Sequence, residues 1–157
     1  MRLRYGIAGL ATILWIASFF LPTALTHQGW TQGYEVAATG WLGPVVGHFG
    51  WYANLLMIPA FAMLAVGRPD LDSDRMSWLA VWLFLFWINS LFWTSAPIFE
   101  GGTLARPDLF VRGPGYFLWM GAVLIGWVGL LILSRANPQV PEKRELTPQD
   151  KDILGIK

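Results

Sequence analysis

The sequence predicts an all-α integral membrane protein: a bundle of four transmembrane helices with a short structured cap on its outer side. Of the 157 residues, 55% are hydrophobic and only 13% are charged, whereas a soluble domain has about a quarter charged residues. The apolar residues lie in four long uncharged runs. A membrane barrel would need about eight strands with alternating polar and apolar residues, and the runs show no such alternation.

Each of the four apolar runs is predicted to form one transmembrane helix. A helix needs about 20 mostly apolar residues to cross the hydrocarbon core of a bilayer, since each residue adds about 1.5 Å. The runs at residues 5–25, 51–67, 76–99 and 113–134 meet or approach this length, and Pro44 is an alternative start for the second. Residues 1–134 are therefore predicted to form one four-span membrane domain, followed by a charged cytoplasmic tail at 135–157.

The distribution of positive charge predicts the orientation. Nine of the eleven Lys and Arg residues precede the first run, separate the second from the third, or follow the fourth. Only Arg106 and Arg112 lie in the other two connections. Because cytoplasmic segments carry an excess of Lys and Arg, both termini are predicted to be cytoplasmic, in an inner or plasma membrane, with residues 26–50 and 100–112 outside.

The first run also has the features of a secretory signal. Met1 to Arg4 supplies a positive start, and Ala24 is a small residue near a possible cleavage point. Cleavage would leave the later spans facing the same way. The run is longer than a usual signal core and contains Trp15, which favours a retained span.

Polar and small residues within the runs suggest where helices meet. Asn54, Asn89 and Ser90 are predicted to hydrogen-bond across helices, because side-chain amides and hydroxyls in a membrane usually find such partners. Small residues that permit close approach cluster in the fourth run, at Gly121, Ala122, Gly126 and Gly129. These four are predicted to form a helix-packing face.

One face of the third run forms a candidate binding groove. At about 100° per residue, one stripe collects four candidate ligand contacts: Trp78, Trp82, Asn89 and Trp93. Such a stripe suits a quinone, a lipid or a pigment, with the amide as its polar contact. The alternative is an aromatic face that packs against neighbouring helices.

The outer connections hold the remaining polar candidates, Glu35, His48 and Arg112. Arg112 is expected to form a salt link between the two connections, for example to Glu35, so that they fold together as a cap. The two histidines match no zinc motif and there is no cysteine, so neither a metal site nor a disulfide is expected.

The predicted function is that of a small non-catalytic membrane protein acting through its helix faces. It would be an accessory subunit of a membrane complex or a regulator or immunity protein, in contact with the bilayer and with a membrane-protein partner or a second copy. One alternative is a binding module that uses the groove on the third run, and another is an outer-face enzyme using Glu35 and His48. The runs hold no ionisable residue, which weighs against an ion pathway. Neither a cofactor nor a nucleic acid is expected.

Overall fold

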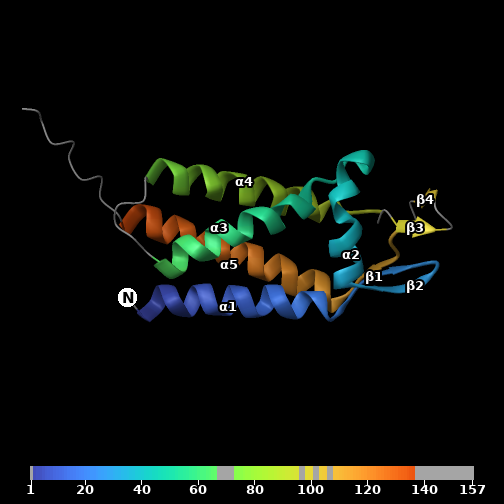
Figure 1. Cartoon of the computed structure of the whole chain (residues 1–157), viewed down its shortest axis with the longest axis horizontal. Coiled ribbons are helices and arrows are strands. Elements are labelled where there is room, and N and C mark those ends of the chain that lie inside the picture. Colours follow the sequence, from blue (N-terminus) through green and yellow to red (C-terminus); the bar gives the residue numbers. More distant parts are fainter. Residues whose placement is uncertain (1, 67–72, 96–97, 101–102, 106–107, 137–157) are drawn as a thin grey trace, which may run out of the picture.

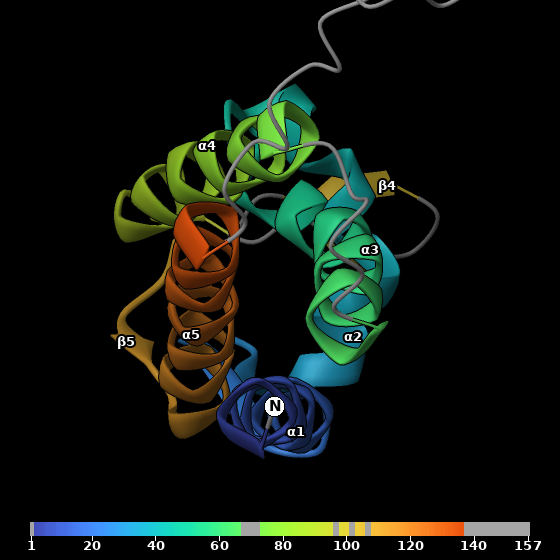
Figure 2. The ribbon, with the colours of Figure 1, turned by 90° about the vertical axis from the view of Figure 1, so that its left-hand side faces the viewer.

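The computed structural model describes residues 2–66, 73–95, 98–100, 103–105 and 108–136. Its described part is mostly helical, with four long helices side by side: α1 (Arg2–Phe19), α3 (Ala53–Val66), α4 (Ser73–Leu91) and α5 (Pro114–Ala136) (Figure 1). Successive long helices run in opposite directions. Helix α5 packs against the other three, and α3 completes the ring by contacting α1 and α4 (Figure 2).

Small side chains bring α5 close to its neighbours. The four residues predicted to pack lie on this helix: Gly121, Ala122, Gly126 and Gly129. Ala122 is completely buried, and a Cβ added to Gly129 would press against Ile7 of α1 and Leu64 of α3. Gly121 differs, because nothing lies within 4 Å of a Cβ placed there. The close approach therefore involves Ala122 and Gly129 but not Gly121.

The prediction of an all-α chain is corrected by a small antiparallel sheet. Strands β1 (Pro22–Thr26) and β2 (Gly29–Gln32) form a hairpin, and β5 (Val111–Arg112) pairs with the other edge of β1. Strands β3 (Ile98–Glu100) and β4 (Thr103–Ala105) form a separate hairpin. The pairs Ala24–Arg112 and Leu25–Val111 join the end of the first predicted span to the second predicted outer connection through backbone pairing.

Two predicted spans end earlier than their apolar runs. Helix α1 stops at Phe19, because the chain turns through a Phe20 N–H bond to the Ala17 carbonyl and enters β1 at Pro22, which has no N–H to donate. Helix α4 ends at Leu91, and the run continues as turn and strand. Among the described helices, one segment, Pro114–Arg135, is long and apolar enough to cross a membrane, while Arg4–Phe19 and Gly50–Val66 are apolar but shorter.

The segment before α3 forms short pieces instead of extending that helix to Pro44. Helix α2 (Gly33–Thr39) is followed by the 3₁₀ helices η1 (Gly40–Val46) and η2 (Gly50–Tyr52). Gly47 separates the two with a φ of 78°, a left-handed conformation that glycine adopts without steric cost. The alternative start at Pro44 is therefore wrong. We call α2, η1, η2 and the sheet strands β1, β2 and β5 the cap.

Candidate functional site

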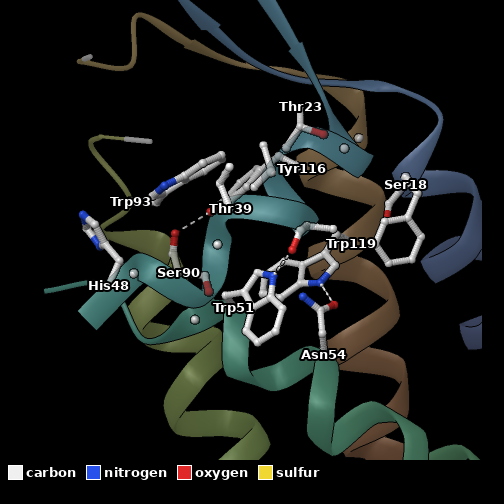
Figure 3. Close-up of a pocket in the computed structure, with 18 of the residues that line it drawn as sticks. Ser18, Thr23, Thr39, His48, Trp51, Asn54, Ser90, Trp93, Tyr116 and Trp119 are labelled. Carbon is white, nitrogen blue, oxygen red and sulfur yellow. Dashed lines mark hydrogen bonds between the residues drawn. The ribbon is translucent and has the colours of Figure 1, made fainter. Parts of the chain in front are cut away.

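A cavity of about 90 Å³ lies where the cap meets the ends of the four long helices (Figure 3). Aromatic rings form much of its wall: Phe19, Trp51, Trp93, Tyr116 and Trp119. A water molecule needs about 10–15 Å³ of such space, so several waters would fit. The cavity is smaller than the roughly 150 Å³ void known to take benzene, and it therefore suits a small group or part of a larger molecule.

Asn54, at the start of α3, joins three helices beneath the cavity. Its carboxamide oxygen accepts hydrogen bonds from the indole N–H of Trp15 on α1 and of Trp119 on α5, both at 2.8 Å. The predicted role of Asn54 in bonding across helices is confirmed. Figure 3 shows the oxygen turned toward Trp119 and the amide nitrogen turned the other way.

Other polar atoms of the wall bond to backbone. The Tyr116 hydroxyl donates to the carbonyl of Ser90 at 2.9 Å, linking α5 to α4, and the Ser90 hydroxyl donates to Phe86 at 2.8 Å. The Trp51 indole donates to the Ala37 carbonyl at 2.9 Å, which ties η2 to α2. These bonds hold the wall in place without using groups from a ligand.

The four residues of the predicted groove are divided between two places. Asn89 and Trp93 line the cavity, and the Trp93 ring stacks on Tyr116 with 5.8 Å between ring centroids. Trp78 and Trp82 do not line it; they lie on the outward face of α4 and are 64% and 49% exposed. The stripe therefore does not form one continuous wall of this cavity.

Asn89 connects α4 to the cap. Its side-chain oxygen accepts hydrogen bonds from the backbone N–H groups of Phe49 at 2.7 Å and Gly50 at 3.0 Å. A Cβ on Gly50 would overlap the Ser90 hydroxyl, so the two segments are in close contact here. Asn89 and Ser90 thus join the cap to the end of α4.

Arg112 and Glu35 act separately instead of forming the expected salt link. The Arg112 guanidinium donates to the carbonyls of Leu91 at 2.6 Å and Trp93 at 3.0 Å, and lies 5.1 Å from the centre of the Tyr116 ring. A cation suits this position, because the carbonyl end of a helix is partly negative. Glu35 accepts a 2.7 Å bond from the backbone N–H of Gln32 as part of a capping box of α2.

His48 lines the cavity from the segment between η1 and η2. Its backbone N–H donates to Gly43 at 2.9 Å, whereas its ring Nδ1 is buried without a hydrogen-bond partner among the described residues. Burial lowers the pKa of the imidazole below its usual 6.5, because desolvation disfavours the charged form. His48 therefore meets the cavity as a neutral ring near pH 7.

This pKa shift predicts that stability falls in acid. The unfolded chain binds a proton on His48 more readily than the folded chain, so the contribution of His48 is complete above about pH 6.5 and is lost as the pH falls toward the lowered pKa. His48→Gln should therefore show a smaller loss of thermal stability between pH 7 and pH 5 than the unchanged protein. His27→Gln, at an exposed histidine, is the control. Equal pH profiles for wild type and His48→Gln would contradict the prediction.

The cavity residues that are not among the predicted ligand contacts include Trp51, Tyr116 and Trp119. Each lies beside a helix end, a position that is typical of membrane-interface aromatics and so has an ordinary explanation. Asn54 is a signal for Trp119 alone, since an amide in an apolar run requires partners and an indole N–H is a suitable donor. The sequence offers ten tryptophans and no way to choose between them.

Among the described residues, no group of three or more His, Asp or Glu side chains lies together as metal ligands. Glu35 does not line the cavity while His48 does, so the cavity does not bring these two together. The residues that line the cavity can provide a bound molecule with hydrogen bonds and apolar contacts. Comparisons with protein-family models, with curated proteins and with solved structures find no match to this chain.

Proposed function

We propose that this chain is a four-span membrane protein with cytoplasmic termini, and that the cavity beneath its outer cap binds a small, mainly apolar molecule. The observation that carries the binding proposal is the cavity itself, with aromatic walls and the amide of Asn54. Pockets for small ligands usually combine apolar walls with a few placed polar groups. The membrane assignment rests on what the helices expose.

The outward faces of the long helices are apolar. Large exposed hydrophobic side chains occur on all four of them, including Leu10, Ile13, Ile16, Leu55, Ile58, Val81, Leu85, Val128 and Ile132. A water-soluble bundle would place charged residues there. Apolar exposure on every helix supports a surrounding of lipid.

Charged residues lie at one end of the bundle. Arg4 is in the first turn of α1, Asp74 and Arg75 are in the first turn of α4, and Arg135 is in the last turn of α5. These ends lie together, opposite the cap (Figure 1). Helix α3 has 14 residues, about 21 Å, so it and η2 would cross where the bilayer thins locally.

Exposed rings surround the opposite end, where the cap lies. They include Phe20, Trp30, Tyr34, Trp41, Phe49, Phe92 and Phe110. Aromatic residues favour the headgroup layer of a bilayer. The cap is thus proposed to lie in the outer headgroup layer, which would place the cavity within reach of molecules dissolved in the membrane.

Cysteine labelling in intact cells tests the orientation. The natural chain has no cysteine, so a single introduced thiol gives an unambiguous signal. A membrane-impermeant maleimide should label His27→Cys, at an exposed position of the β1–β2 turn, and should leave Lys143→Cys unlabelled until the cells are opened. Labelling of Lys143→Cys with protection of His27→Cys would refute the orientation.

Native mass spectrometry after mild detergent extraction tests the binding. The wild type should carry a bound small-molecule mass, which Ala37→Phe should lose because Ala37 lines the cavity and the larger ring would fill it. Ala38→Phe is the matched control. Ala38 is the next residue in α2, and its own side chain is exposed and does not line the cavity. Identical spectra for all three proteins would count against a ligand in this cavity.

The exposed face of α4 supports a second candidate, contact with a membrane-protein partner or a second copy. Trp78 and Trp82 extend outward there, and large aromatic residues are enriched in protein interfaces. This role would give a protein mass in the same spectra. Trp78→Ala with Trp82→Ala should remove that mass without affecting a ligand in the cavity.

A further inference from the structure

We infer that the cavity selects an uncharged molecule by a hydrogen-bond acceptor, a carbonyl oxygen attached to an apolar chain, which takes the side-chain N–H donors of Asn54. This inference rests on the ligand binding proposed above and specifies what is bound. It follows from the orientation of one amide, the lack of charge around it and the size of the space.

The orientation of the Asn54 amide is fixed by its partners. An indole nitrogen can donate a hydrogen bond but cannot accept one. The indoles of Trp15 and Trp119 both lie 2.8 Å from the same amide atom, which must therefore be the oxygen. Turning the amide over would set its donors against two other donors, and both hydrogen bonds would be lost.

The same orientation leaves the amide nitrogen unpartnered. Asn54 Nδ2 carries two N–H donors, and neither has a hydrogen-bond partner among the described residues. Asn54 lines the cavity, and its nitrogen points away from Trp119 (Figure 3). This nitrogen is not enclosed by protein, so water or an occupant of the cavity must satisfy it, and an occupant with an acceptor is favoured over a plain hydrocarbon.

The wall indicates that the occupant is uncharged. Among the described residues that line the cavity there is no Asp, Glu, Lys or Arg, and burial keeps His48 neutral. The nearby Arg112 is occupied by two backbone carbonyls and the Tyr116 ring. A buried ion without a counter-charge is costly, so a carboxylate or an ammonium group is disfavoured.

The volume favours a chain over a ring system. About 90 Å³ is less than the roughly 150 Å³ that takes benzene, so a quinone ring or a pigment does not fit the space as it stands. A narrow chain can place its carbonyl and a few methylene groups in this partly open space while the rest of the molecule stays outside, as 2-hexanone, which is larger than benzene, would have to do. Two sources share this chemistry: the ester of a membrane lipid, and a free ketone or ester dissolved in the bilayer.

The test compares two probes that differ by one carbonyl. The full chain is placed in nanodiscs of diether lipid, which lacks ester carbonyls, and binding of 2-hexanone and of hexane is followed by saturation-transfer NMR. For the wild type, 2-hexanone should bind about tenfold more tightly than hexane, since one net hydrogen bond of about 1.4 kcal/mol is a factor of ten. Repeating the titration in diester lipid identifies the source: a weaker apparent affinity indicates competition by lipid esters and an unchanged one indicates a free compound, and both results support the inference.

The matched variant is Asn54→Asp. At a pH where the introduced carboxyl is ionised, it still accepts from both indoles but offers no donor, so the preference for 2-hexanone should disappear. The unpaired charge at the cavity wall is expected to lower the thermal stability. A second measurement uses the wild-type protein alone. With ¹⁵N-asparagine labelling only three side-chain amides are visible, and the Asn54 signal should shift on addition of 2-hexanone and not of hexane.

Three results would be contrary, and they are distinct. Equal binding of the two probes by the wild type, or an unchanged preference in Asn54→Asp, would overturn the inference while leaving a binding site; water would then satisfy the amide. If neither probe binds the wild type better than it binds Ala37→Phe, the proposed binding function itself fails.

Discussion

Replacing Gly33 by alanine is expected to lower the free energy of unfolding by about 3 kcal/mol, the upper part of the usual range for an overpacked site. A Cβ at this position would overlap the Ser18 carbonyl oxygen and lie 2.8 Å from the Phe19 Cα. Both obstacles are backbone atoms, so no change of side-chain rotamer can relieve the clash. The backbone N–H of Gly33 also donates to Leu21 at 3.0 Å, which holds the start of α2 against the end of α1.

Thermal and denaturant unfolding in one detergent would measure this loss. Gly9→Ala is the matched control, because Gly9 is in α1 and a methyl group added there would have nothing within 4 Å. That control should equal the wild type or exceed it by up to about 1 kcal/mol, since alanine is the better helix former. Equal stability of Gly33→Ala and Gly9→Ala would mean that α2 can move away from α1 without cost.

The sequence predicted the positions of the long helices better than their ends. Helix α5 was expected at 113–134 and occupies Pro114–Ala136, because one apolar run coincides with one helix. The run at 5–25 instead contains a helix and a strand, since Pro22–Thr26 continues the uncharged run of the helix before it. Hydropathy measures burial or lipid contact and does not distinguish a helix from a strand that continues the same run.

In the candidate site, the sequence likewise indicates which polar residues need partners but not which partners they have. Asn54 and Asn89 were recognised as polar groups that need partners, and both have them. The partners are not predictable from the sequence, because the pairings join residues 39 to 65 positions apart. The expected link between Arg112 and Glu35 failed for a local reason: helix ends leave unpaired backbone groups, and each charged side chain binds the end nearest to it.

Substitution of Asn89 by leucine should loosen the cap and destabilise the protein by about 2 kcal/mol. Leucine fills similar space but leaves the N–H groups of Phe49 and Gly50 without their acceptor, and an unsatisfied buried donor costs about 1–3 kcal/mol. The expected destabilisation is smaller than twice the cost of one unsatisfied donor. The Phe49 N–H is exposed, so water can replace the acceptor that it loses.

The location of the effect distinguishes loss of this contact from general damage to α4. Amide hydrogen exchange of Asn89→Leu should accelerate at residues 49 and 50 and remain unchanged in the middle of α5, which does not depend on the cap for its own hydrogen bonds. Asn89→Asp retains an acceptor oxygen and should keep the slow exchange and most of the stability. Since Asn89 and Gly50 also line the cavity, faster exchange there should accompany weaker binding of its occupant. Uniform acceleration along α4 in both variants would instead assign Asn89 a role in the helix itself.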